Sequence, residues 1–470
     1  MNREKQLVKN TIIITIGKIC TQLISFFLLP LYTGILSTEE YGIVDLLNTL
    51  ASLLLPIVTF QIEQAMFREL IEVRKDENSK KTIITTGIVS VVCQCFLFLV
   101  LFAIISPFVH NDYKLFLATN VITYIFLSLF QQIARGLGDN KKYAFGSFLS
   151  ALFTIIFNVL FIAIIRLGAT GMLLGTMLGQ LLAIMYLFFS LKLYRYIEMH
   201  RYKKILLKKL WKYSIPLIPN AISWWVFNAS NRVITSTFLG VAENGVLAAS
   251  LKFSSVFITF YNIFNMSWTE SISISINDDD IDGYFNKMFN VMLRLFTALG
   301  IGIIVCMPFV FPIMINEKYS SGYGLVPLSI LGSLFNVVVG LISVIYVAKK
   351  NTKAIANTSI ISAILNIIVN IALIKFAGLY AAVIATFVAF FTMSIYRLYD
   401  IKKKYFKIII DKSLIIKTII VLLIILPAYY INNLYFNIFS LLLAVVFAWD
   451  LNKNSVKPIL NMVKAKVKKV

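Results

Sequence analysis

Long apolar stretches constrain the fold of this chain more than any other feature. Fourteen windows of mostly apolar residues are separated by short polar breaks, and a helix needs roughly 20 such residues to cross a bilayer. Strands of a closed barrel would be about ten residues long with alternating polarity, so the windows predict helices. We therefore expect an all-α polytopic membrane protein with 14 transmembrane helices. The windows are 11–31, 43–65, 83–109, 115–134, 144–165, 171–191, 214–239, 246–268, 288–315, 325–348, 354–374, 378–396, 414–431 and 434–448.

The distribution of charge predicts how these helices are oriented. Only 14% of the residues are charged and 59% are hydrophobic, which excludes an ordinary soluble surface. The net charge of +22 would suggest nucleic-acid binding in a soluble chain, but the basic residues fall almost wholly on alternate connections, such as 192–212 and the tail 453–469. The positive-inside rule then places both termini in the cytoplasm and indicates that no nucleic acid is bound, and we expect the first window to be retained rather than cleaved. The acidic segment 270–283 is expected to be a solvated loop, with a regulatory or gating role as the alternative.

The chain also contains an internal repeat. LVKNTI at 7–12 matches LWKYSI at 210–215 with a shift of 203 residues, and the same shift separates Gly42 from Gly245. A second block repeats in the same order, with Lys141-Lys142 and Asn158 matching Lys349-Lys350 and Asn366 at nearly the same spacing. Such a pattern predicts two pseudo-symmetric six-helix lobes related as parallel repeats. The expected domains are an N-lobe at 1–191, a linker at 192–213, a C-lobe at 214–396, and a segment 397–470 with two extra helices and a basic tail.

Polar residues follow one face of windows one, two, seven and eight, within arcs of about 60° to 120° at 100° per residue. These windows are equivalent pairs in the repeat. Because a polar side chain is expensive in hydrocarbon, the four stripes predict a common polar space between the lobes, with interhelical hydrogen bonds as the alternative. The stripes are Thr11, Thr15, Lys18, Gln22 and Ser25; Asp45, Asn48, Ser52, Thr59 and Glu63; Asn220, Trp224, Asn228, Asn231 and Arg232; and Lys252, Ser255, Thr259, Asn262 and Glu270.

Three cations lie deep in these stripes, namely Lys18, Arg232 and Lys252. Placing one near the middle of a bilayer costs about 3 kcal/mol on insertion scales, so three of them need a reason. A cationic cavity for an anionic phosphate and its sugar hydroxyls is one reason, and internal pairing with Asp45, Glu63 or Glu270 is the other. Arg68 and Arg294 lie near the cytoplasmic ends of their helices, where they either line the same path or snorkel to the interface.

The opening of the chain carries three short motifs in a fixed order. A basic residue with Asn-Thr stands at Lys9–Thr11, a Leu-Pro-Leu-Tyr-Thr run at Leu29–Thr33, and a Ser-x-Glu-Glu-Tyr-Gly turn at Ser37–Gly42. This order resembles the amino-terminal signature of bacterial polysaccharide-biosynthesis flippases, in which the three motifs open the first helix, end it and start the second. The chain thereby resembles the multidrug, oligosaccharidyl-lipid and polysaccharide (MOP) exporter superfamily, in its Wzx-type repeat-unit flippase branch. Its fold would then be similar to that of the MATE transporters of this superfamily.

The resemblance implies a function. An undecaprenyl-diphosphate-linked oligosaccharide would move by alternating access from the inner to the outer leaflet of the bacterial cytoplasmic membrane, for surface polysaccharides such as O-antigen or capsule. Helices one, two, seven and eight form the cavity in that family. A proton or sodium gradient would supply the energy, with no cofactor, metal or enzymatic reaction, and polysaccharide polymerase machinery is an expected partner. The acidic residue that cation-exporting relatives place in the first helix is not evident, and Lys18 holds the charged position.

These considerations predict roles for particular residues. We expect Lys18, Arg232 and Lys252, helped by Arg68 and Arg294, to hold the diphosphate. An ion-coupled exporter of small amphiphiles or drugs and a peptidoglycan-precursor (lipid II) flippase are the alternative functions. For ion coupling or gating we expect Asp45, Glu63 and Glu270. The residues expected to line the cavity and contact the glycan are Thr15, Gln22, Asn48, Ser52, Trp224, Asn228, Asn231, Thr259 and Asn262.

Overall fold

The computed structural model describes residues 26–108, 112–349 and 351–467, and every regular element in these ranges is helical. Twelve of the described helical segments are long and apolar enough to cross a membrane, which confirms an all-α, multi-pass membrane protein. Of the fourteen expected windows, the first lies mostly outside the described residues. The seventh forms a 21-residue helix, α10 (Ile218–Phe238), but its polar interruptions keep it out of the twelve.

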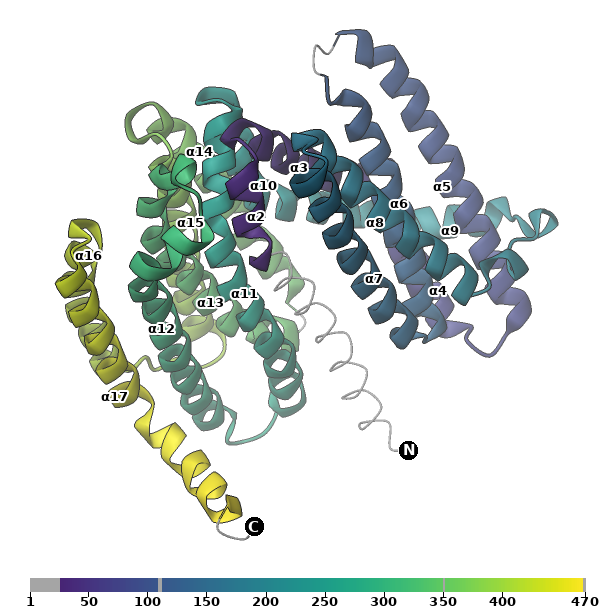
Figure 1. The fold of residues 1–470 in the computed structure, drawn as a ribbon. Helices are drawn as coiled ribbons and strands as arrows, with labels where there is room; N and C mark the ends of the chain where they lie inside the picture. Colours follow the sequence, from purple (N-terminus) through teal and green to yellow (C-terminus); the bar gives the residue numbers. More distant parts are fainter. Residues whose placement is uncertain (1–25, 109–111, 350, 468–470) are drawn as a thin grey trace. The chain divides into compact units, whose positions relative to one another are not determined.

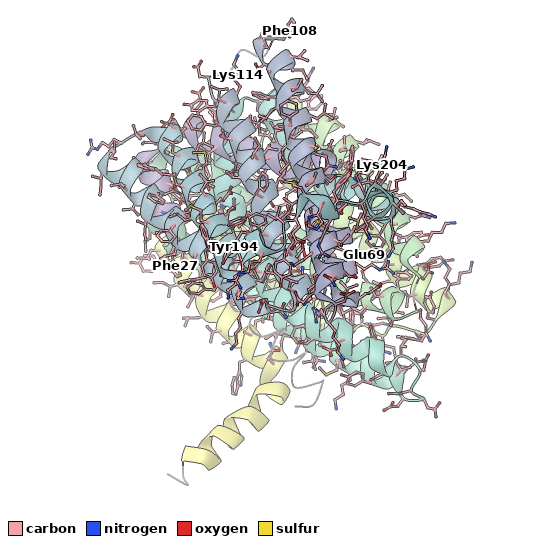
Figure 2. All side chains as sticks on the ribbon, turned by 90° about the vertical axis from the view of Figure 1, so that its right-hand side faces the viewer. Phe27, Glu69, Phe108, Lys114, Tyr194 and Lys204 are labelled. Carbon is pink, nitrogen blue, oxygen red and sulfur yellow. The ribbon has the colours of Figure 1, made fainter. Side chains whose placement is uncertain are left out.

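Contacts divide the chain into two compact units, residues 1–245 and 246–470 (Figure 1). In the first unit α7 and α8 form a helical hairpin, and α6 packs against α4 and α8. Side chains from α4, α5, α6, α8 and α9 build its main core, around Met66 and Phe130. Lys114 donates to the carbonyl of Ser106 (2.8 Å) at the turn between α5 and α6, which Figure 2 marks by Phe108 and Lys114. The helices of this unit are α2 (Leu29–Ile35), α3 (Thr38–Val58), α4 (Ile62–Glu72), α5 (Glu77–Ile105), α6 (Lys114–Leu137), α7 (Asn140–Asn158), α8 (Gly168–Ser190), α9 (Lys204–Ser214), α10 and the first turn of α11 (Val241–Ser275).

The second apolar window, predicted as one helix over 43–65, is broken in the structure. After α3 ends, Phe60 and Gln61 take left-handed backbone angles (φ 50° and 57°), and α4 then begins in a new direction. Pro56 in the last turn of α3 cannot donate a helical hydrogen bond, and the hydroxyl of Thr59 accepts from the amide of Gln61 (3.1 Å). The expected window 43–65 ran across Pro56 and the polar residues Gln61, Glu63 and Gln64 as one span, so the break was not predicted. As a result, Glu63 follows the break and is no longer in helical register with the stripe of α3.

The turn before α3 is a capping box, as its sequence suggests. The amide of Glu40 donates to the hydroxyl of Ser37 (3.1 Å), and the amide of Ser37 donates to the carboxylate of Glu40 (2.9 Å). The other carboxylate oxygen of Glu40 accepts from the amide of Ala169 at the start of α8 (3.3 Å). One acidic residue therefore satisfies free amides at the beginnings of two helices.

Gly42 and Gly245, the pair identified in the internal repeat, lie against each other's helices. A Cβ atom on Gly42 would lie 2.0 Å from the carbonyl oxygen of Val241, and one on Gly245 would lie 1.9 Å from that of Thr38. Thr38 and Val241 are also 203 positions apart, so the contact is reciprocal. Two duplicated segments around a local two-fold axis produce this reciprocity, and only glycine allows so close an approach. The lobe boundaries expected from the repeat stay a prediction.

In the second unit α13, α14 and α15 pack together, while α16 and α17 pack against each other and against α12. The acidic segment 270–283 is a loop only in part, because α11 continues as helix to Ser275 and α12 starts at Ile281. Asp278, Asp279 and Asp280 are exposed in the short connection that remains. The helices of this unit are the rest of α11, α12 (Ile281–Met314), α13 (Val326–Ala348), α14 (Thr352–Ala377), α15 (Tyr380–Lys404), α16 (Lys412–Ile431) and α17 (Leu434–Val467).

Candidate functional site

A polar cluster lies in the first unit where α3, α10 and the first turn of α11 meet. Nη1 of Arg232 lies 3.3 Å from Oδ1 of Asp45 and donates to the hydroxyl of Thr49 (3.2 Å). Asp45 and Thr49 are four residues apart and therefore share one face of α3. The Asp45 side chain is 13% exposed and that of Arg232 is 28% exposed, so the pair is mostly withdrawn from the surface. Of the two explanations for Arg232 that the sequence left open, internal pairing with Asp45 is present in the structure.

Trp225 extends the same contact by two helical turns. Its indole Nε1 donates to the carbonyl of Thr49 (2.8 Å) and to the hydroxyl of Ser52 (3.0 Å). The sequence reasoning named Trp224 and missed Trp225. The signal was present, because Trp225 and Arg232 are seven residues apart and must lie on one face of α10.

Asn244, in the first turn of α11, is a second residue that the sequence reasoning missed. It is fully buried, and its Nδ2 donates to the carbonyl of Gly42 (3.1 Å) and to Oδ2 of Asp45 (3.4 Å). The carboxylate of Asp45 is therefore held on one oxygen by a guanidinium and on the other by an amide. Only the close approach permitted by Gly42 brings this amide to Asp45, so helical periodicity could not have predicted it.

The guanidinium of Arg232 is not saturated by these contacts. Its Nε is buried and has no hydrogen-bond partner among the described residues. A guanidinium carries five N–H donors and cannot lose its charge in a protein, so an unused donor favours an additional acceptor. The cluster can thus accept an anionic or strongly polar group beside the Asp45 pair.

Several other predicted residues fall on these helices or outside the described residues. Lys18, Thr15 and Gln22 lie outside the described residues, as do the side chains of Trp224 and Asn228. Asn48 is exposed on α3 and accepts a hydrogen bond from Nδ2 of Asn120 (2.8 Å), whereas Asn231 on α10 is buried. Four predicted residues lie on α11 in the second unit. Thr259 bonds within its own helix, Lys252 is half-buried, and Asn262 and Glu270 are exposed.

Glu63 lies apart from the Asp45 cluster, directly after the break that ends α3. Its side chain is 2% exposed, and one carboxylate oxygen, Oε2, has no hydrogen-bond partner among the described residues. No described cation lies within ion-pair distance of it. A carboxylate in the first turn of a helix is favoured by the helix dipole, which partly compensates the missing partner.

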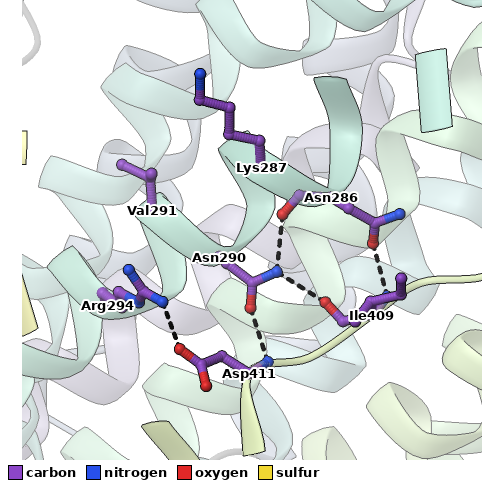
Figure 3. A pocket seen from close by; sticks show the side chains of 7 residues that line it. All are labelled: Asn286, Lys287, Asn290, Val291, Arg294, Ile409 and Asp411. Carbon is purple, nitrogen blue, oxygen red and sulfur yellow. Dashed lines mark hydrogen bonds and ion pairs between the residues drawn. The ribbon is translucent and has the colours of Figure 1, made fainter. Parts of the chain in front are cut away.

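Arg68 and Arg294, predicted to help hold a diphosphate, have protein partners. Arg68 stacks on the ring of Tyr213 (4.6 Å to the centroid) and lies 3.9 Å from Glu72. Arg294 on α12 forms an ion pair with Asp411, the residue before α16. It lines an open pocket of about 490 Å³ together with Lys287 and two asparagines (Figure 3).

Those asparagines, Asn286 and Asn290, hold the segment before α16 as a neighbouring strand would (Figure 3). Asn286 accepts from the amide of Ile409 (2.6 Å) and donates to the carbonyl of Lys407 (3.0 Å). Asn290 accepts from the amide of Asp411 (2.9 Å) and donates to the carbonyl of Ile409 (2.7 Å). Four residues of helix rise about 6 Å and two residues of strand about 6.6 Å, so the two spacings match. We call this set of contacts the asparagine ladder; it anchors the connection between α15 and α16 to α12.

Arg397 on α15 is a buried cation that the site predictions did not include. It is 2% exposed and donates to the hydroxyls of Thr358 (2.7 Å) and Ser359 (3.2 Å) on α14 and of Ser343 on α13. No carboxylate lies within 4 Å of it among the described residues. The guanidinium joins three helices of the second unit through hydroxyl groups, and this role is structural.

Comparisons with known proteins agree with this fold. The family model described as "Polysaccharide biosynthesis protein" matches residues 7–269, more than half of the chain. A search of curated proteins found no match.

Three solved structures illustrate the similarity. An inward-facing multidrug resistance MATE family transporter of the MOP superfamily covers 83% of this chain and 96% of its own, with TM-score 0.67 and 12% identity. The lipid II flippase MurJ, in an inward closed conformation, covers 96% and 100%, with TM-score 0.61 and 16% identity. A MOP superfamily transporter from Pyrococcus furiosus covers 86% and 96%, with TM-score 0.57 and 14% identity. At these identities the structures establish the fold, and the family model establishes the family. The chain therefore belongs to the polysaccharide biosynthesis protein family, and it has the multi-pass membrane fold of MOP superfamily transporters.

Proposed function

We propose that this chain is an alternating-access flippase that moves an undecaprenyl-diphosphate-linked oligosaccharide from the cytoplasmic to the outer leaflet of a bacterial cytoplasmic membrane. Both termini then lie in the cytoplasm. The observation that carries the proposal is Arg232, a half-buried cation in a polar cluster on helices that are otherwise apolar. Membership of the polysaccharide biosynthesis family supports a glycan substrate.

In this proposal Arg232 alternates between Asp45 and the diphosphate. Arginine binds phosphate oxygens through parallel N–H donors, and its unused Nε offers one such donor. When the phosphate takes the guanidinium, Asp45 keeps the amide of Asn244 as a partner, so the carboxylate is not left bare. The ion pair thereby stabilises the site when no substrate is bound. Breaking it costs only a limited free energy, because Asp45 keeps the hydrogen bond from Asn244. Lys18 and Lys252 are proposed as further phosphate contacts.

The glycan is proposed to lie along the polar face of α3 and α10. Asn48 is exposed in the middle of a spanning helix, and Ser52 is a half-buried hydroxyl one turn away. Amide and hydroxyl groups both donate and accept hydrogen bonds, as sugar hydroxyls do, so they suit a glycan ligand. Thr15, Gln22, Asn231, Thr259 and Asn262 complete the proposed lining, together with Trp224 and Asn228.

A proton or sodium gradient is proposed as the energy source, with Glu63 as the coupling carboxylate. Its burial without a cationic partner among the described residues, beside a break in a membrane helix, is a setting in which a cation or proton would be held. Glu270 and Asp45 remain candidates for gating. Arg68 and Arg294 would take part in substrate binding only after leaving their present partners.

Genetic complementation tests the proposal. In a strain that lacks its repeat-unit flippase, the wild-type gene should restore surface polysaccharide. Arg232→Ala should abolish rescue while the protein keeps its normal abundance in the membrane. Arg232→Lys should retain part of the rescue, because the ammonium keeps the positive charge but not the parallel N–H donors of the guanidinium. Lys402→Ala, which removes an exposed cation on α15, is the matched control and should rescue fully.

The alternatives give different results in the same strains. Rescue of a strain depleted of its lipid II flippase, without polysaccharide rescue, would favour a peptidoglycan-precursor substrate. Resistance to amphiphilic drugs, without either rescue, would favour a small-molecule exporter. Full polysaccharide rescue by Arg232→Ala would refute the role given to this residue.

A further inference from the structure

The segment between α8 and α9, together with α9, carries charge that the described part of the chain does not neutralise. Residues 192–213 contain eight basic residues and one acidic residue, Glu198. Glu198 is already held by Lys81 and Arg201, and Lys209 of α9 pairs with Glu69 of α4 (2.6 Å). Four further lysines, Lys203, Lys204, Lys208 and Lys212, are exposed and have no ion pair among the described residues. This surface therefore has cations available for an external partner.

One face of α9 fixes the helix to the first unit. Leu207, Leu210 and Ser214 are buried there and recur at helical spacing. The ring of Trp211 packs edge-on against Phe60 (centroids 6.2 Å apart), at the break in the second membrane helix. Figure 2 shows α9 close to end-on, with Lys204 at the labelled end and Glu69 of α4 nearby. The orientation of the opposite face is thus set by packing, and that face points away from α4 and α5.

The outward face of α9 combines an apolar side chain with a ring of lysines. Ile205 is 87% exposed, and Lys208 and Lys212 follow it three and seven residues later, on the same face. Lys204, directly before Ile205, is exposed at the start of the helix. Met199 and Tyr202, just before α9, are also exposed, at 69% and 39%. An isolated isoleucine surrounded by lysines suits a surface that is apolar inside and anionic at its edge, which is the structure of a phospholipid interface.

The position of α9 in the chain places it at such an interface. α8 is a candidate membrane span, and only Ile215–Leu217 separates the end of α9 from α10. A helix that ends three residues before a predicted span cannot be far from the headgroups. Anionic lipids attract clustered lysines at this depth, and each lysine adds to the attraction.

We propose that the outward face of α9, formed by Ile205, Lys208 and Lys212 with Lys204 beside it at the start of the helix, is a docking surface for anionic phospholipid headgroups. Ile205 enters the boundary between headgroups and acyl chains, and the three lysines contact lipid phosphates. The opposite face of α9 packs against α4 and Phe60. Anionic lipid would therefore bind the helix that connects the two expected lobes along the chain. This inference is independent of the transported substrate.

A fluorescent label at Ile205→Cys tests the proposal, with the native cysteines replaced by alanine and the full chain reconstituted in nanodiscs. In anionic discs the label should be shielded from iodide and quenched by nitroxide-bearing lipids. In zwitterionic discs it should be open to iodide. Because each basic residue shifts binding to an anionic surface about fivefold, removing three should lower the equilibrium constant for contact between this face and the anionic lipid on the order of 100-fold.

Three further variants keep the test specific. Changing Lys204, Lys208 and Lys212 to glutamine should erase the difference between the lipids, while changing them to arginine should preserve it. Changing Lys402, Lys403 and Lys407 to glutamine alters the net charge equally at a distant basic segment and should have no effect. Equal iodide access in both lipids would overturn the proposal, as would an equal effect of the distant control. If the label stays shielded from iodide in anionic discs after the three lysines are changed to glutamine, their charge does not cause the docking and the proposal is wrong.

Discussion

Replacing Asn290 with alanine should release one rung of the asparagine ladder and leave the other in place. Asn290 accepts from the amide of Asp411 (2.9 Å) and donates to the carbonyl of Ile409 (2.7 Å). Asn286 independently holds the amide of Ile409 (2.6 Å). Asn290→Ala therefore removes the acceptor of the Asp411 amide and keeps the acceptor of the Ile409 amide, which lies two residues earlier in the chain.

The size of the effect follows from these two hydrogen bonds. Each contributes about 0.5–1.5 kcal/mol net, so their loss should cost about 1–3 kcal/mol in the free energy of opening the segment. Ile409 is exposed and water can replace its partner, which favours the lower half of that range. Since about 1.4 kcal/mol corresponds to a factor of ten, the Asp411 amide should exchange roughly 10-fold faster.

Hydrogen exchange resolved to single amides measures this. In Asn290→Ala the Asp411 amide should accelerate more than the Ile409 amide, and in Asn286→Ala the order should reverse. Lys287→Ala, on the same turn of α12, lines the same pocket but contributes no hydrogen bond to the segment and is the matched control. If both amides accelerate equally in both asparagine variants, or if Lys287→Ala has the same effect, the register argument is wrong.

Three other predictions concern single contacts. Gly42→Ala should lower the melting temperature and block function, because its Cβ would lie 2.0 Å from a backbone carbonyl oxygen. Gly34→Ala, which meets nothing within 4 Å, should be tolerated, and thermal unfolding in detergent compares them. The hydrogen bond from Lys81 lowers the pKa of Glu198 from 4.5 to about 2, so its contribution to linker docking should be complete above about pH 4.5 and lost as the pH falls through about 2. Limited proteolysis of the linker across this range, with Glu198→Gln as an insensitive control, checks the sign. Arg397→Lys should destabilise the protein, measured by the same unfolding assay, because one ammonium cannot reproduce a planar fork that reaches two other helices.

Much of the candidate site could be predicted from helical periodicity. Asp45 and Ser52 on α3 and Arg232 on α10 lie on the polar faces that 100° per residue predicts, and the structure brings these faces together. The periodicity did not predict that Asp45 would be the partner of Arg232, since Glu63 was an equal candidate. That choice depends on the break at Phe60 and Gln61, which removes Glu63 from the face of α3.

The contacts of the remaining cations depended on other parts of the chain. Arg294 pairs with Asp411, more than a hundred residues away, because the asparagine ladder brings the segment before α16 onto α12. Nothing in the local sequence of either segment indicates this pairing. Asn244 reaches Asp45 only because Gly42 lets two backbones approach closely.

The amino-acid sequence by itself determined the class of the protein, the helical type of its membrane segments and the faces on which polar groups lie. These properties follow from the cost of placing polar groups in hydrocarbon, which acts on each helix separately. The tertiary structure alone decided which acid meets which base, where a spanning helix breaks, and which lysines of α9 are exposed without an ion pair among the described residues. Those outcomes depend on how helices are rotated and how closely they approach, and distances of a few ångström between remote segments are not encoded in any local pattern.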